Sequence, residues 1–152
     1  MLRAKNEATA EDFQIKGLKT AGGEETLRFE VSLYFGAKRV ATVSNGGTGG
    51  CHKWDWLNKE AEECFDRLLE TLAFEFDFEK DDQFIDRLID KQVETALFKS
   101  KCKKKTLFLL ADEETKDGYR MVNAVFSPEV KSYLVNKYGV QLGEIINERF
   151  LP

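Results

Sequence analysis

The sequence has few of the residues that usually signal catalysis or metal binding. Its 152 residues include one histidine, His52, and three cysteines, Cys51, Cys64 and Cys102, which form no CxxC pair. An odd number of cysteines disfavours a disulfide framework, and the missing paired motif disfavours a cysteine-based zinc site. We therefore expect reduced thiols, no metal site and no cofactor.

Long apolar stretches are also missing. No run of eighteen or more apolar residues occurs, and the start, MLRAKNEATAEDF, lacks the apolar core of a secretory signal. An apolar content of 42% with twelve phenylalanines favours a folded, soluble chain. Because 152 residues are typical of one domain, we expect a single α+β domain over residues 1–152, cytoplasmic and without membrane contact.

The net charge of −4 is distributed unevenly along the chain. Residues 55–94 contain fourteen acids and five bases, which leave nine net negative charges. Residues 1–54 carry eight bases and six acids, and residues 95–152 carry ten bases and seven acids. An acidic block therefore lies between two mildly basic ends.

Alternating apolar residues predict a sheet near the start. In TLRFEVSLYF, residues 26–35, apolar and polar side chains alternate with the period of a strand that buries one face. The neighbouring stretches DFQIKGLK (12–19) and KRVATVS (38–44) complete an antiparallel three-stranded meander.

The hairpin loop that begins at Gly36 has two candidate lengths. A two-residue loop would bury Val40 and Thr42, whereas a three-residue loop would bury Ala41 and Val43. The second face is the more apolar, so we favour the longer loop.

After the glycine-rich stretch at residues 46–50, the apolar residues take up helical spacing. The apolar residues of 57–72 fit a helix of about five turns with Asp55 as its N-cap, and those of 84–97 fit a second helix capped by Asp81 or Asp82. Residues 74–78 alternate phenylalanine with acids, which leaves open a short strand or a connection after a helix end.

The last third predicts a second hairpin and a short helix. TLFLLAD (106–112) and GYRMVNAVF (118–126) form the hairpin, and residues 128–138 form a helix between Ser127 as N-cap and Gly139. Residues 140–150 stay open between strand and helical turn. The expected fold is α+β: the meander and the later hairpin form an antiparallel sheet, packed against two long acidic amphipathic helices and one short C-terminal helix.

The most distinctive stretch is SNGGTGGCHKWDW, residues 44–56. A strand, a glycine-rich turn and a helix can hold an anion through backbone N–H groups at the helix N-terminus. The stretch matches neither GxxxxGK[ST] nor GxGxxG in a βαβ unit, so we favour a simple turn over a nucleotide or phosphate-bearing metabolite site. The residues of the ligand-binding hypothesis are Asn45, Gly46, Gly47, Gly49, Gly50, His52, Lys53, Trp54 and Trp56.

Two further interpretations concern the same stretch. If Trp54 and Trp56 begin a helix, their side chains diverge by about 200°, so we expect one to be buried and the other exposed. Cys51 and His52 could act as nucleophile and base, but adjacent side chains rarely meet and no third orienting group is evident. We therefore expect no catalytic residues and no enzymatic activity.

The acidic block suggests a protein partner. A surface with many net negative charges repels nucleic acid and attracts basic clefts, including the nucleic-acid groove of another protein. The five lysines of KSKCKKK lack interleaved aromatics, so direct nucleic-acid binding is not expected. The residues of this partner-binding hypothesis are Glu62, Glu63, Asp66, Glu70, Asp77, Asp81, Asp82 and Asp86.

In size, acidic helical middle and phenylalanine-rich core, the chain resembles small accessory proteins of phages and other mobile elements. These include anti-CRISPR and anti-restriction inhibitors of host defence, some of which imitate nucleic acid. The resemblance rests on overall character and on no motif. It implies a non-enzymatic inhibitor that docks its acidic face on a nucleic-acid-handling protein. The apolar residues of 84–97 fit packing either against the first predicted helix or against a second copy of the chain, which would form a homodimer.

Overall fold

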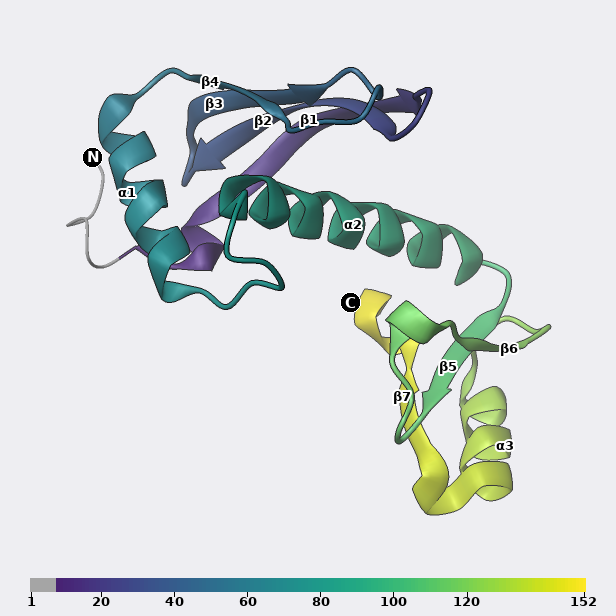
Figure 1. The fold of residues 1–152 in the computed structure, drawn as a ribbon. Helices are drawn as coiled ribbons and strands as arrows, with labels where there is room; N and C mark the ends of the chain where they lie inside the picture. Colours follow the sequence, from purple (N-terminus) through teal and green to yellow (C-terminus); the bar gives the residue numbers. More distant parts are fainter. Residues whose placement is uncertain (1–7) are drawn as a thin grey trace. The chain divides into compact units, whose positions relative to one another are not determined.

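The computed structural model describes residues 8–152 and confirms the α+β class (Figure 1). The chain divides into two compact units between Asp90 and Lys91, and helix α2 (Lys80–Lys101) contributes to both. Each unit has its own small antiparallel sheet, so the predicted meander and the later hairpin lie in two sheets rather than in one. The single domain that the length suggests stays a prediction.

The first unit is built on a four-stranded antiparallel sheet with the order β1-β2-β3-β4. The predicted meander is present, and a fourth strand that was not predicted extends it beside β3. The strands are β1 (Phe13–Gly22), β2 (Leu27–Phe35), β3 (Lys38–Asn45) and β4 (Lys53–Trp56).

The β2–β3 hairpin corrects the predicted loop length while keeping the predicted buried face. Phe35 pairs with Lys38, so only two residues form the loop, and the register then shifts so that Leu33 pairs with Ala41. This bulge leaves Val40 unpaired, and both Val40 and Ala41 are buried. The extra residue in β3 therefore places Ala41 and Val43 on the core face even though the loop has only two residues.

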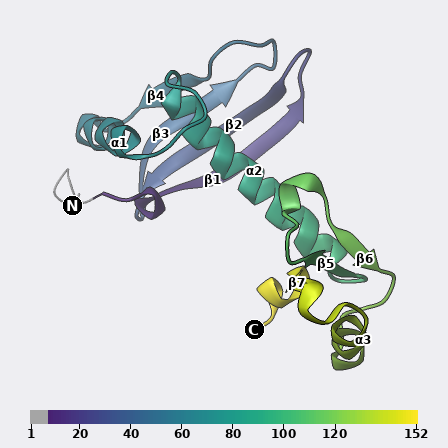
Figure 2. The ribbon, with the colours of Figure 1, turned by 60° about the horizontal axis from the view of Figure 1, so that its bottom comes forward.

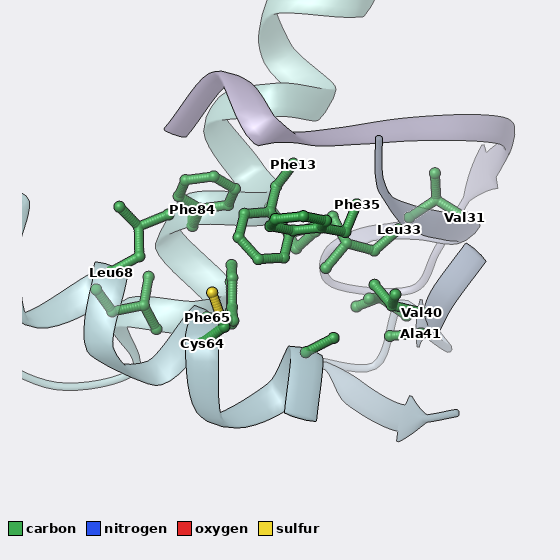
Figure 3. Close-up of a cluster of buried hydrophobic side chains, with 14 of the residues drawn as sticks. Phe13, Val31, Leu33, Phe35, Val40, Ala41, Cys64, Phe65, Leu68 and Phe84 are labelled. Carbon is green, nitrogen blue, oxygen red and sulfur yellow. The ribbon is translucent and has the colours of Figure 1, made fainter. Parts of the chain in front are cut away.

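The main core lies between this sheet and helices α1 (Lys59–Thr71) and α2. Helix α1 and the first half of α2 lie on one side of this sheet (Figures 1 and 2). Their buried residues form one cluster with the alternating apolar residues of β2. Phenylalanines join the layers: the ring of Phe65 in α1 lies 5.1 Å from Phe13 of β1 and 5.2 Å from Phe84 of α2, edge to face (Figure 3). This geometry is the one that aromatic quadrupoles favour.

The helix starts differ from the predicted caps. Asn58 is the N-cap of α1, and its side chain accepts a hydrogen bond from the Ala61 N–H at 2.9 Å. Asp55 lies in β4 instead, because the chain forms this unpredicted strand before the helix begins. Helix α2 begins at Lys80, so Asp81 and Asp82 occupy its first turn rather than the cap position.

The second unit centres on strand β5 (Thr106–Leu110), which lies between β6 (Arg120–Val122) and β7 (Leu142–Ile145). The predicted hairpin is the β5–β6 pair. Helix α3 (Pro128–Tyr138) has the predicted Ser127 cap, whose hydroxyl accepts from the Val130 N–H. The open region 140–150 holds both β7 and a short 3₁₀ helix, Ile146–Phe150.

Strand β5 is buried on both faces within the second unit. Leu107 and Leu109 pack with Phe98 and Ile146, while Phe108 packs with Leu134 of α3. The other 3₁₀ turns among the described residues are Ala10–Asp12, Thr115–Asp117 and Gly139–Gln141. No helix within residues 8–152 is long and apolar enough to cross a membrane.

Candidate functional site

The glycine-rich stretch connects two strands of one sheet. Lys53, in β4, pairs with Ser44 of β3, so no helix follows the glycines directly. The expected order of strand, turn and helix is therefore wrong. The N–H groups of the loop do not lie at a helix N-terminus. The less favoured hypothesis of an anion site in this loop therefore lacks the helix dipole that would support it.

The loop is braced by the turn between β1 and β2. The carbonyl of Gly47 accepts hydrogen bonds from the N–H groups of Glu25 and Thr26, at 2.8 and 3.1 Å. Gly47 has a φ of +81°, and a Cβ there would lie 2.6 Å from the Cα of Gly23. Only glycine fits this position, because the backbone is left-handed and a second backbone touches it.

A chain of side-chain hydrogen bonds links the loop to helix α2. The Asn45 Oδ1 accepts from the Gly47 N–H at 2.8 Å, which turns its Nδ2 toward the Gly50 carbonyl and the Nδ1 of His52, at 3.3 and 3.0 Å. The His52 Nε2 then lies 2.7 Å from the Asp86 Oδ1. In this network Nδ1 of His52 accepts from Asn45 and Nε2–H donates to Asp86.

The environment of His52 sets its protonation behaviour. Partial burial lowers the pKa of His52, and the hydrogen bond to Asp86 with the charges of Asp86, Asp82 and Asp81 raises it by more, so the pKa lies above its ordinary value. Both ring nitrogens are occupied by partners. Asn45 lies at Nδ1 and Asp86 at Nε2, so neither nitrogen is directed at the exposed Cys51 thiol.

Asp82 is a second anchor between this segment and α2. It is buried, with 7% of its surface exposed, and its Oδ2 accepts from the His52 N–H at 2.8 Å. Its Oδ1 accepts from the Trp54 Nε1–H at 2.9 Å. Although the sequence assigns Asp82 to a partner-binding surface, both its oxygens serve the fold.

The two tryptophans share one face of β4, which corrects the expected split. Residues at i and i+2 of a strand point to the same side, so Trp54 and Trp56 stack with centroids 5.5 Å apart and planes 12° apart. Both are half-buried, and each lies 5.4 Å from the Phe65 ring. They cover the core of the first unit.

A cavity of about 350 Å³ adjoins this network within the first unit. Of the nine residues in the ligand-binding hypothesis, the structure brings Asn45, Gly50 and His52 to its wall. Helix α2 adds two carboxylates to the lining, those of Asp86 and Asp90. The remaining lining residues are Thr26, Leu27, Phe29 and Ile89, whereas Gly46, Gly47, Gly49, Lys53, Trp54 and Trp56 lie outside it.

Half of the partner-binding residues gather around a different hollow. Five carboxylates and one ammonium line a concavity of about 600 Å³ formed by α1, the connection after it and the start of α2. The carboxylates belong to Asp66, Glu70, Asp77, Glu79 and Asp81. Lys80 offsets part of their charge, because its Nζ lies 3.2 Å from Asp77 and 3.8 Å from Glu70. Glu62 and Glu63 are on α1 outside the lining.

The carboxyl group of Asp66 has a raised pKa. Loss of hydration raises the pKa of Asp66, and the nearby carboxylates of Glu62, Asp81 and Glu70 raise it further. Like charges are therefore held close enough to oppose ionisation. This hollow is a centre of negative potential in the first unit.

The structure adds two residues that the sequence hypotheses omitted. Phe76 and Phe78 lie in the connection between α1 and α2, where residues 74–78 form neither strand nor helix. Both rings are exposed, at 50% and 61% of their surfaces. The alternation of phenylalanine and acid was their signal, because apolar residues without a strand to bury them remain at the surface.

The chain matches no protein-family model, no curated protein and no solved structure. Within residues 8–152, no group of three or more histidine, cysteine, aspartate or glutamate side chains is arranged to hold a metal ion.

Proposed function

We propose that the chain is a small, non-enzymatic binding protein of the cytoplasm that docks an acidic surface on a basic, nucleic-acid-handling protein. The observation that carries this proposal is the hollow with five carboxylates and one ammonium. The raised pKa of Asp66, caused first by burial and then by neighbouring carboxylates, supports it, because groups held in a state that opposes their ionisation are typical of functional surfaces. Inhibition of a host defence protein, as phage and mobile-element proteins perform it, is the biological form we propose.

The docking surface consists of the exposed acids around the hollow. Asp66, Glu70 and Asp77 are exposed and Asp81 is half-buried, so all four are accessible from outside. We leave out Asp82 and Asp86, because they hold His52 and Trp54. A partner would meet negative potential throughout a hollow of about 600 Å³, which favours fast, salt-sensitive association with a basic groove.

The test is capture of proteins from cell lysate by the tagged chain, followed by competition with duplex DNA. The proposal expects a retained protein that binds nucleic acid and that DNA releases, because the acids occupy the same groove as phosphates. A variant with Asp66, Glu70, Asp77 and Asp81 changed to lysine should lose this partner. The matched control reverses four exposed acids elsewhere, Glu24, Glu30, Asp112 and Asp117, and should retain it. Equal capture by both variants, or capture that DNA leaves intact, contradicts the proposal.

A second candidate function is ligand binding in the cavity beside His52. The observation that favours it is the convergence of Asn45, Gly50 and His52 on one space of about 350 Å³. It ranks second because Asp86 and Asp90 oppose a phosphate there. A thermal shift with ATP that disappears in a Leu27→Trp variant, which fills the cavity, would favour it over the docking surface. No shift with ATP or inorganic phosphate counts against it.

A further inference from the structure

The most exposed aromatic feature of the first unit is the pair formed by Phe76 and Phe78. Their centroids lie 5.3 Å apart with planes at 28°, so the rings stack on each other. Each still leaves half or more of its surface in water. Clustered exposed aromatics are costly for a soluble protein and are enriched at contact sites.

The backbone that presents these rings is fixed in place. Gln83, in α2, donates from Nε2 to the carbonyls of Phe76 and Phe78 at 3.0 and 2.8 Å, and its Oε1 accepts from the Phe76 N–H at 3.4 Å. One side chain thereby holds both residues of the pair. A surface arranged before binding loses less conformational freedom when a partner arrives.

Carboxylates surround the pair on the same segment. Glu75, Asp77 and Glu79 alternate with the two rings, and the Asp77 side chain is 98% exposed. Asp77, Phe78 and Glu79 also line the acidic hollow, so one ring of the pair, that of Phe78, borders the carboxylates of the hollow. A ligand for this segment needs positive charge together with a flat face that can lie on a ring.

The protein itself contains such a contact at Phe74, the phenylalanine that precedes the pair in the alternating segment. The guanidinium of Arg87 lies over the Phe74 ring, with its carbon 4.4 Å from the centroid, and its Nη2 donates to the Ala73 carbonyl at 2.7 Å. Among the described residues, no cation lies over Phe76 or Phe78. The next rings of the series are therefore open to a guanidinium from outside.

We propose that Phe76 and Phe78, with the carboxylates of Glu75, Asp77 and Glu79, recognise arginine side chains of the partner in preference to lysine. A guanidinium stacks on an aromatic face and can bond a carboxylate through two N–H groups, whereas an ammonium is a strongly hydrated point charge. This inference rests on the proposed function and specifies its partner: the basic groove presents arginines at the acidic hollow.

The test compares hexa-arginine and hexa-lysine peptides, each with one fluorescent label, by fluorescence anisotropy with the full chain. Both peptides carry the same side-chain charge, so a difference in Kd reports recognition beyond charge. We expect hexa-arginine to bind at least about threefold more tightly, the size of a cation–π contact at an exposed site. In a Phe76→Ser, Phe78→Ser variant the two Kd values should become equal, with hexa-lysine binding retained.

A matched control changes two exposed apolar residues elsewhere, Leu57→Ser and Val93→Ser, and should keep the arginine preference. Circular dichroism melting checks that both variants fold. Equal Kd values for the two peptides on the unmodified chain, or a preference that survives loss of both rings, overturn the arginine inference alone. Failure of both peptides to bind, or binding that the four-lysine reversal leaves unchanged, overturns the acidic surface and the inference with it.

Discussion

The His52 imidazole and the Asp86 carboxylate are separated by 34 positions in sequence, yet their Nε2 and Oδ1 atoms lie 2.7 Å apart. This contact ties the end of the glycine-rich loop to helix α2. The sequence assigns His52 to ligand binding and Asp86 to partner binding. In the structure they belong to one hydrogen-bond network. Asn45 completes the network by fixing the other ring nitrogen.

We expect the pKa of His52 to lie above 6.5, and an Asp86→Asn substitution to lower it, because the charge that favours the imidazolium is removed. An Asn45→Asp substitution should raise the pKa further, since it replaces the amide donor at Nδ1 with an acceptor. NMR titration measures this directly, as the chain has one histidine. A wild-type pKa below 6.5 would mean that burial and the hydrogen bond from the Asn45 amide lower the pKa of His52 by more than Asp86 raises it.

The same shift predicts a pH dependence of stability. A histidine with a raised folded pKa contributes stability that is complete below its unfolded pKa near 6.5 and is lost as the pH rises through the folded pKa. The wild-type protein should therefore exceed Asp86→Asn in melting temperature by more at pH 6 than at pH 8. A difference that grows toward pH 8 would contradict the assigned direction.

Asp82→Ala should destabilise the first unit by about 3 kcal/mol, because the backbone N–H of His52 and the indole N–H of Trp54, whose hydrogen bonds are partly buried, lose their acceptor. Urea unfolding followed by tryptophan fluorescence measures this loss. The matched control is Asp77→Ala, whose side chain is 98% exposed and should change stability by less than about 0.5 kcal/mol. Equal effects of the two variants would show that the Asp82 contacts contribute little.

Gly47→Ala should cost at least about 2 kcal/mol, since the φ of +81° is strained for alanine and its Cβ would meet Gly23 and Thr26 at under 3 Å. The neighbouring Gly46 is exposed and has no such φ, and a Cβ added there would meet no heavy atom within 4 Å, so Gly46→Ala should be close to neutral. Chemical denaturation of both variants compares them. A mild Gly47→Ala would indicate that the turn between β1 and β2 moves aside.

Regular periodicity allowed much of the fold to be predicted. The alternation of 26–35 and the helical spacing of α1 describe elements that bury one face, and the Ser127-Pro128 pair marks the start of α3. Of the apolar residues predicted for α2, Phe84, Ile85 and Ile89 are buried, whereas Val93 and Leu97 are exposed. Strand β4 was missed because it has four residues, too few to show a period, and the apolar pattern of α1 follows it closely. The two tryptophans were therefore placed on a helix and given opposite environments.

The polar network could not be predicted from the sequence. Asp82 looks like any acid on an amphipathic helix, and its burial depends on donors 28 and 30 positions away. Asn147 is a parallel case in the second unit, where its side chain bonds the Leu107 N–H and the Lys105 carbonyl, both at 2.8 Å. Such long-range pairings depend on the completed fold, whereas periodicity is local.

Asp66→Asn should raise the melting temperature at pH 7, because its carboxylate ionises against loss of hydration and against Glu62, Asp81 and Glu70. A carboxyl group with a raised folded pKa costs stability as the pH rises through that pKa, so the gain should shrink in acid and in high salt. Calorimetry of both proteins at several pH values and salt concentrations measures it. If Asp66→Asn also weakens hexa-arginine binding, then the negative charge of Asp66 both lowers the stability of the fold and binds the partner. Such a cost in stability is expected when a surface is retained for function. A variant that loses stability would mean that Asp66 has a favourable structural role.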